Sequence, residues 1–397
     1  MEFVIKQSAL KEVLGYVQGV VERKSTIPVL SNILIESLGE NSIRIVGTDL
    51  DVTIRCDAEA EIKKGGAICI QARKLFDLSR LLNGADVKFK KEDNEWVSVT
   101  SGRGKFRLAG VNKEQFPEIP IFKSAPLKLS AEVFNYFIQH TAFAITNEQS
   151  RFTLSGAKFI LSDGKAKMVT TDGHRLAYIE RSLDVPTEGS MDALIPKKAL
   201  LELVKISRDS GEDVSFGEDQ NHIYFELEGR LLITRKLSGN FPNYEMVMPK
   251  DNDKTVIFDL DDMKGAVRRV ALMADERNRS IRLTVREGEI ELSAQSSEEG
   301  EGNEVLPADY KGEEMQLGFN WQYLQDFLNT VSAVQAGDGE AGAEGTNETD
   351  GDKVRVKETS SPTRISFEFK DSNAQTQMRI AGETSYDYKY IVMPLRI

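Results

Sequence analysis

Ile195-Pro-Lys-Lys-Ala199 marks a point where an apolar strand gives way to a helical pattern, and the chain contains this junction three times. Its other copies are Ile70-Gln-Ala-Arg-Lys74 and Phe319-Asn-Trp-Gln-Tyr323, at spacings of 125 and 124 residues. After each copy, apolar residues return three or four positions apart, as at Leu200 and Leu203. This periodicity predicts a helix with one buried face. A repeat of this length predicts tandem copies of one structural domain.

A second strand-to-helix junction recurs at similar spacings. So does a three-residue segment near the end of each copy, which we call the closing tag. The predicted strands that begin this junction are Phe3-Val-Ile5, Leu127-Lys-Leu129 and Phe258-Asp-Leu260, 124 and 131 residues apart. The closing tags are Leu108-Ala-Gly110, Leu237-Ser-Gly239 and Ile380-Ala-Gly382, 129 and 143 residues apart. Each copy therefore reads strand, helix, alternating strands, strand, helix and further strands, an α+β unit with two helices and two antiparallel sheets. We expect three such domains, over residues 1–123, 126–250 and 254–397.

The long spacing in the third copy has a visible cause. Residues 335–352 contain five glycines, six acidic residues and no apolar residue larger than alanine. Such a low-complexity segment cannot bury a core. Without its 18 residues, the spacing of 143 becomes 125. We interpret it as an insertion, and favour a disordered surface loop over a regulatory element.

Composition and charge limit the classes of function that the chain can have. The chain has 397 residues and a net charge of −12, and residues 251–397 alone carry that whole excess. Because charge is unevenly distributed, locally basic faces can still bind DNA. No apolar run approaches the ~18 residues of a membrane span and no secretory signal is recognisable, so we expect a cytoplasmic protein without a membrane partner. Two cysteines, Cys56 and Cys69, are too few for a metal cage, and we expect buried thiols rather than a disulfide.

Few motifs suggest an enzyme. Residues 337–342 match G-x-G-x-x-G, but acidic neighbours and the lack of a preceding strand argue against a phosphate site. Asp172-Gly-His174 could supply an acid–base pair, or could be a turn in which the aspartate binds its own backbone. Asp49 and Asp51 could share a cation. Because Thr48-Asp49 and Thr171-Asp172 occupy like positions of two repeats, a repeated structural turn is favoured.

One stretch carries a family resemblance. Thr171-Asp-Gly-His-Arg-Leu-Ala177, within the three repeats, resembles the bacterial DNA polymerase III beta subunit, the family of replicative sliding clamps. Further matching segments are residues 26–32, 47–50, 72–74, 241–244 and 390–397. The resemblance implies a clamp fold in a head-to-tail homodimer, with six domains in a ring and helices around the hole. It implies a non-enzymatic processivity factor that encircles duplex DNA, with no cofactor.

The resemblance also implies DNA-contacting residues on the helices and on two loops. We expect contacts to phosphate without sequence information, which suits a ring that slides. The residues carried over by position, or found as basic residues at the start of the second helices, are Lys24, Arg73, Lys74, Arg80, Asn147, Glu148, Gln149, Arg151, Phe152, Thr153, Lys197 and Lys198.

A peptide-binding pocket between repeats two and three is implied as well. It would bind short segments of the DNA polymerase III alpha subunit, the clamp loader and other proteins with a clamp-binding motif. Its implied lining is Leu154, Thr171, Gly173, His174, Arg175, Leu176, Pro242, Met246, Val247, Met393, Pro394, Leu395 and Arg396. Apolar side chains with pliable methionine are typical of such a groove.

The implied dimer interface joins repeat one of one copy to repeat three of the other. Phe106 and Leu108 would pack against Leu272 and Met273 of the partner copy. Basic residues of repeat one would face acidic residues of repeat three, namely Arg103 and Lys105 opposite Glu298, Glu299, Glu301 and Glu304. Three alternatives stay open: a sequence-independent DNA-binding regulator, a clamp paralogue in repair or resistance, and a hydrolase centred on Asp172 and His174.

Overall fold

The computed structural model describes residues 1–22, 26–121, 125–148, 150–183, 189–208, 210–338, 362–383 and 385–396. All six predicted strand-to-helix junctions are present. They are β1 (Glu2–Lys6) to α1 (Gln7–Val17), β6 (Ala67–Gln71) to α2 (Ala72–Leu81), β11 (Leu127–Ser130) to α3 (Ala131–Thr141), β15 (Met191–Pro196) to α4 (Lys197–Ser207), β19 (Lys254–Asp259) to α5 (Leu260–Val270), and β23 (Met315–Asn320) to α6 (Trp321–Asp338). The repeat pattern therefore predicted the local structure correctly.

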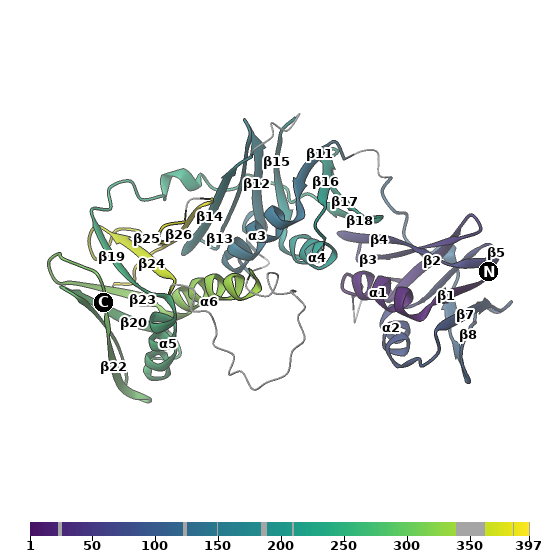
Figure 1. Cartoon of the computed structure of the whole chain (residues 1–397), viewed down its shortest axis with the longest axis horizontal. Coiled ribbons are helices and arrows are strands. Elements are labelled where there is room, and N and C mark those ends of the chain that lie inside the picture. The colour runs from purple at the N-terminus through teal and green to yellow at the C-terminus, as the bar shows by residue number, and fades with distance from the viewer. Residues whose placement is uncertain are drawn as a thin grey trace, which may run out of the picture. The chain divides into compact units, whose positions relative to one another are not determined.

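The helices form where the apolar periodicity places them. Leu200, Leu203 and Ile206 are buried along α4. The start of α5 is capped by Asp259, whose carboxylate accepts hydrogen bonds from the backbone N–H groups of Asp261 at 2.9 Å and Asp262 at 3.0 Å. Within one repeat the two helices lie against each other, as α1 and α2 do, and likewise α5 and α6 (Figure 1).

The remaining strands are short and antiparallel. They are β2 (Asn32–Leu38), β3 (Ser42–Thr48), β4 (Val52–Glu59), β5 (Glu61–Lys64), β7 (Asp86–Lys91), β8 (Val97–Ser101), β9 (Gly104–Leu108), β10 (Gly110–Val111), β12 (Gly156–Ser162), β13 (Lys165–Thr171), β14 (Arg175–Ser182), β16 (Asp213–Glu218), β17 (His222–Leu227), β18 (Arg230–Arg235), β20 (Ser280–Arg286), β21 (Glu289–Ser296), β22 (Gly300–Pro307), β24 (Arg364–Phe369), β25 (Thr376–Ile380) and β26 (Asp387–Val392).

The chain forms two compact units, Met1–Asn135 with Thr187–Leu237, and Tyr136–Pro186 with Ser238–Ile397. The first unit holds sheets of strand order β5-β1-β7-β8-β9 and β10-β6-β2-β3-β4-β18-β17-β16-β11. The second holds the run β12-β13-β14-β26-β25-β24-β19 and the sheet β22-β21-β20-β23. The units divide the second repeat because its sheets continue into both neighbouring repeats. The predicted domain boundaries therefore remain predictions.

Sheets cross from one repeat to the next at two equivalent seams. Strand β4 of repeat one pairs with β18 of repeat two, with Val52 opposite Thr234. Strand β14 of repeat two pairs with β26 of repeat three, with Arg175 opposite Val392. Each seam follows directly after one of the two Thr-Asp turns. The turns are therefore placed at the junctions between repeats.

Aromatic side chains fill much of the core. In the first unit, Phe3 stacks on Phe89 with ring centroids 4.7 Å apart. In the second, Phe327 stacks on Tyr390 at 5.1 Å. The two cysteines are buried and free, as expected, and burial raises the pKa of the Cys56 thiol to about 12.

Two further expectations concern the described part of the chain. Helix α6 reaches Asp338, so it includes the first residues of the predicted insertion, and residues 339–352 lie outside the described residues. Within the described ranges, no helix combines the length and apolar character needed to cross a membrane.

Candidate functional site

The Thr-Asp turn of repeat two is built from its own side chains. The Thr171 hydroxyl accepts a hydrogen bond from the N–H of Gly173 at 3.0 Å. One carboxylate oxygen of Asp172 accepts from the N–H groups of His174 at 3.0 Å and Arg175 at 3.1 Å. Gly173 has a φ of +92°, which glycine adopts without strain. The short polar side chains therefore fix the backbone direction into β14.

Repeat one contains the same turn. The Thr48 hydroxyl accepts from the N–H of Leu50 at 3.0 Å, and Asp49 accepts from Asp51 at 3.0 Å and from Val52 at 2.7 Å. The favoured interpretation, a repeated structural turn, is confirmed. The two turns differ at one decisive position: a leucine with a φ of +80° in repeat one replaces the glycine of repeat two.

Arg175 ties the second turn to the third repeat. Its side chain, 9% exposed, donates to Asp172 at 3.0 Å, to Asp326 on α6 at 2.6 Å and to the carbonyl of Phe143 at 2.9 Å. The guanidinium also lies 4.6 Å from the ring centroid of Tyr323. Burial alone would lower the pKa of Arg175, but a nearby tyrosine hydroxyl and the two carboxylates raise it above its ordinary value. The Arg175 side chain is therefore held in one position and stays charged.

A pocket of about 120 Å³ opens beside this turn. It is lined by Leu154, Thr171, Gly173, His174, Arg175, Leu176, Pro242, Asn243, Tyr244, Val247, Ile391 and Met393. Nine of these were predicted from the sequence. Beneath them, Leu176 and Ile391 pack with Val169 and Tyr178 in one apolar cluster. The arrangement suits the apolar side chains of a short extended segment.

Four predicted pocket residues are not among those that line the cavity. The Met246 side chain lies on a short 3₁₀ turn and is 80% exposed. Pro394, Leu395 and Arg396 follow the last lining residue, and the N–H of Leu395 donates to the carbonyl of Gly318 at 2.8 Å. The tail thus runs along β23 instead. The involvement of these four remains a prediction.

Three lining residues were missed. Ile391 lies two positions before Met393 on the last strand, so strand alternation from Met393 could have found it. Asn243 and Tyr244 come directly after Pro242. Their inward orientation depends on the 3₁₀ turn Tyr244–Met246, which is too short to leave a periodic pattern of apolar residues.

Of the candidate acid–base pair, Asp172 is held in a structural role, whereas the His174 side chain is exposed at the pocket. The Asp172 carboxylate accepts hydrogen bonds from two backbone N–H groups and from the Arg175 guanidinium. The His174 ring lies roughly parallel to the Tyr323 ring, with their centroids 6.4 Å apart. Among the described residues no group of three His, Cys, Asp or Glu side chains could hold a metal ion. This arrangement supports a binding surface more than a reaction centre.

The predicted DNA-contacting residues fall into three places. Arg73 and Lys74 on α2 line a hollow that also contains Phe106 and Leu108. Arg80 lies on the last turn of α2. Lys197 and Lys198 begin α4, and the Lys198 ammonium pairs with Asp49 and donates to the carbonyl of Val20 at 2.9 Å.

Lys198 therefore stabilises the first seam, in the way that Arg175 stabilises the second. The basic pair at the start of α2 lies beside residues expected at the dimer interface. Which of these cations contact DNA remains a prediction.

The remaining DNA candidates lie around the loop before β12. Phe152 and Thr153 form a 3₁₀ turn, and Phe152 is 69% exposed. Arg151 pairs with Glu148 at 3.1 Å and donates to the carbonyl of Asp172 at 2.9 Å. Asn147 directly precedes Glu148. Lys24 and Gln149 lie outside the described residues.

The residues predicted for the dimer interface lie on two open sheet edges. Strand β9 is the last strand of its sheet and carries Lys105, Phe106 and Leu108, with Arg103 in the preceding turn. Strand β22 is the last strand of the other sheet. It carries Glu301 and Glu304, while Glu298 and Glu299 precede it and Leu272 and Met273 lie in the 3₁₀ turn after α5.

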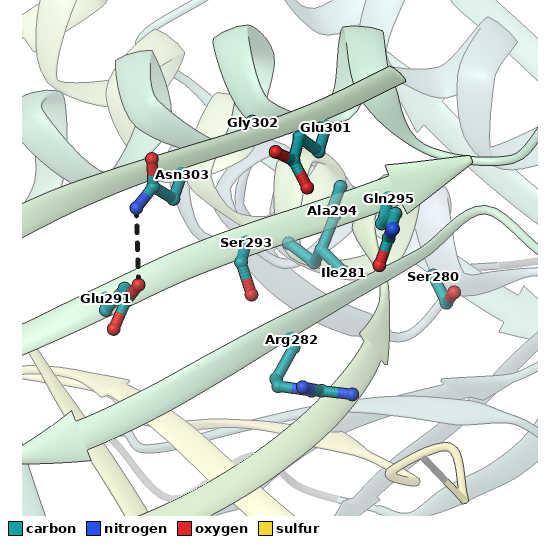
Figure 2. A pocket seen from close by; sticks show the side chains of 10 residues that line it. All are labelled: Ser280, Ile281, Arg282, Glu291, Ser293, Ala294, Gln295, Glu301, Gly302 and Asn303. Atoms are coloured by element: carbon teal, nitrogen blue, oxygen red, sulfur yellow. Dashed lines mark hydrogen bonds between the residues drawn. The ribbon is translucent and has the colours of Figure 1, made fainter. Parts of the chain in front are cut away.

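The two faces of β22 differ in their polar groups. Figure 2 shows Glu301 and Asn303 on the same face as Glu291, to which Asn303 donates at 3.4 Å. Glu304 lies on the opposite face, where it accepts from Arg269 on α5 at 2.5 Å. Because successive side chains of a strand alternate, Glu301 and Glu304 do not face a partner on the same side. The expectation that both meet Arg103 and Lys105 remains a prediction, and Glu304 already has an internal partner.

Comparison with known proteins identifies related sequences over the whole chain. Family models for the N-terminal, central and C-terminal domains of the DNA polymerase III beta subunit match residues 1–120, 128–243 and 245–337. A beta sliding clamp of Chlamydia pneumoniae is 33% identical over 329 residues, 83% of this chain and 89% of that protein. One from Pseudomonas putida is 32% identical over 401 residues, covering both chains completely.

Solved structures agree. A DNA polymerase sliding clamp from Pseudomonas aeruginosa superposes with a TM-score of 0.85 at 28% identity, over all of both chains. A sliding clamp from Bartonella birtlesii bound to griselimycin superposes with a TM-score of 0.87 at 29% identity, again over all of both chains. The resemblance that the repeats and the Thr171–Ala177 segment predicted is thus confirmed.

Proposed function

Because this chain belongs to the DNA polymerase III beta subunit family, we propose that it works as a sliding clamp whose two copies close into a ring around duplex DNA. The protein is a processivity factor: it keeps the replicative polymerase on its template. The observation that carries the ring is the pair of open strand edges, β9 and β22, with complementary side chains. Neither edge is paired within the described residues.

The two edges fit each other in charge and in apolar surface. An open edge presents unpaired N–H and C=O groups that a strand of another copy can satisfy. Lys105 and Arg107 alternate on β9 with Phe106 and Leu108. In our arrangement the basic side chains meet the Glu301 side of β22. Phe106 and Leu108 meet Leu272 on the helix side. Head-to-tail contacts of this kind close into a ring when the rotation permits.

DNA binding follows from the helices rather than from base-reading groups. Two helices per repeat, twelve in the ring, would face the duplex. Their cations would contact phosphate only, which gives affinity without sequence preference. A sequence-specific regulator would instead need a recognition element whose side chains read base edges. A clamp paralogue for repair or resistance would share all these features and differs only in its partners.

The pocket beside the second turn would receive peptides. Its apolar floor of Leu176 and Ile391 and its fixed Arg175 suit a short segment with apolar side chains and a polar backbone. The partners we assign are the DNA polymerase III alpha subunit, the clamp loader and other proteins with a clamp-binding motif. Catalysis and a resident cofactor have no part in this proposal, and the site of action is the cytoplasm.

A primer-extension assay tests the proposal. The template is a primed single-stranded circle with polymerase, clamp loader and ATP, and product length is measured with and without this chain. We expect products many times longer in its presence. Gly173→Leu, which adds a bulky side chain at a residue of the pocket lining, should abolish the gain while leaving the dimer intact. Unchanged product length with the wild-type chain would contradict the proposal.

A further inference from the structure

The sheet β5-β1-β7-β8-β9 has one buried face and one solvent face. Along β7, Val87 and Phe89 are buried and alternate with the exposed Lys88 and Lys90. Along β9, Leu108 is buried. The buried side is lined in part by α2, whose residues share a hollow with Phe106 and Leu108. The lysines therefore lie on the face turned away from α2.

Strand register groups four cations on this solvent face. It places side chains in two rows, Lys88–Thr100–Lys105 and Lys90–Ser98–Arg107. From strand geometry, the cations of one row are about 10 Å apart and the two rows are about 7 Å apart. We call these four residues, with Trp96, the cationic face.

Most of this charge is not neutralised within the described chain. Arg107 is paired with Glu92 at 2.5 Å. For Lys88, Lys90 and Lys105 the described residues provide no ion-pair partner. In the proposed ring, Lys105 and Arg107 face the Glu301 side of the partner's β22, so Lys88 and Lys90 are the cations of this face left for a ligand. Three carboxylates share the neighbourhood: Glu92, Glu2 opposite Lys90 on β1, and Asp86, which lies two positions before Lys88 on β7 and pairs with Lys6. With Lys6 counted, five cations share this neighbourhood with the three carboxylates, on a protein whose net charge is −12.

A flat aromatic surface lies among the cations. Trp96 precedes β8 and, by strand alternation, shares the face of Ser98. It is 38% exposed, and the Arg107 guanidinium lies 4.7 Å from its ring centroid. An exposed tryptophan beside a row of cations is the combination with which proteins bind unpaired bases and their phosphates.

We propose that the cationic face binds single-stranded nucleic acid, with phosphates on Lys88 and Lys90 and a base stacked on Trp96. A duplex keeps its base faces stacked inside and leaves Trp96 unused. An acidic peptide would use the cations alone. The site lies on a different sheet from the peptide pocket and adds an activity that encircling a duplex does not require.

Binding of a linear fluorescein-labelled oligothymidylate to the full chain, measured by anisotropy at several salt concentrations, tests this. No clamp loader is present, so ring loading plays no part. Each lost phosphate contact lowers the salt slope for a single strand by about 0.7. The double variant Lys88→Gln, Lys90→Gln should therefore lower it by about 1.4. Trp96→Leu should weaken binding about fivefold or more.

Lys128→Gln with Lys311→Gln is the matched control, because it removes the same charge from two exposed lysines elsewhere. It should leave affinity and slope unchanged. In a Trp321→Phe background, Trp96 is the only tryptophan, and the oligonucleotide should quench its fluorescence. Equal losses in both lysine variants, or unquenched Trp96, would overturn the proposal. Stronger binding by a polyglutamate peptide than by the oligonucleotide would overturn it in favour of an acidic protein partner.

Discussion

Replacing Leu272 with alanine should weaken the ring, because this side chain is the main exposed apolar group beside the β22 edge. It is 69% exposed in the single chain. The partner copy offers a hollow of about 440 Å³, lined by Leu78, Leu81, Phe106 and Leu108 among others. Leu272 is therefore the natural occupant of that hollow. Met273 differs, because its side chain already packs over Gly302 of its own chain.

The size of the effect follows from the exposed fraction. Burying a whole leucine side chain contributes about 1.5–3 kcal/mol. Covering the exposed part of Leu272 therefore contributes about 1–2 kcal/mol at each junction by the same scale. A ring of two copies has two such junctions, so Leu272→Ala should cost about 2–4 kcal/mol in total. The dissociation constant of the dimer should rise about 30- to 700-fold.

Sedimentation over a dilution series measures this constant directly. The control is Leu201→Ala, a leucine of α4 that is also exposed and belongs to neither edge strand. It should leave the dimer unchanged. The double variant Leu272→Ala, Met273→Ala should be monomeric at concentrations where the wild type is dimeric. A dimer of unchanged strength in the double variant would refute the assignment of this interface.

Three other perturbations have defined outcomes. Burial lowers the pKa of His140 from 6.5 to about 4, so its contribution to stability is complete above pH 6.5 and falls as pH drops toward 4. In urea titrations, the free energy of unfolding of His140→Phe should fall by about 3 kcal/mol less than that of the wild type as the pH drops from 6.5 to 4. Gly173→Leu should fold, because Leu50 occupies the equivalent position, yet calorimetry should find peptide binding at least about tenfold weaker; unchanged affinity would show that the pocket lies elsewhere. Lys198→Met should lower the free energy of unfolding by about 2 kcal/mol, and adding Asp49→Asn should restore part of it; no recovery would mean that the ion pair does not hold the seam.

Local features of the fold could be predicted from the sequence, because periodicity and turn chemistry are local. The junction at residues 195–199 and its two copies became strand-to-helix junctions as expected. The two Thr-Asp turns formed with the same hydrogen bonds, since each depends on side chains within five residues. The predicted pocket residues, by contrast, came from the family resemblance of the Thr171–Ala177 segment and not from periodicity or turn chemistry.

Long-range pairing could not be predicted. Lys198 looked like a free cation at a helix start, but its partner Asp49 lies 149 residues earlier in the chain. Arg73 and Lys74 were assigned to DNA by their charge, and only packing places them beside Phe106. The direction in which a helix presents its basic residues depends on the sheet against which the helix packs. The spacing of residues along the sequence does not contain that information.

Retention on a nicked circular duplex tests the central claim most directly. The chain is loaded with a clamp loader and ATP, the complex is washed at high salt, and the circle is then cut once. Binding that depends on charge alone should weaken steeply with salt and ignore topology. We predict that the protein survives the salt wash on the closed circle and is lost when the DNA is linearised. Equal loss from circle and linear DNA would contradict an encircling ring.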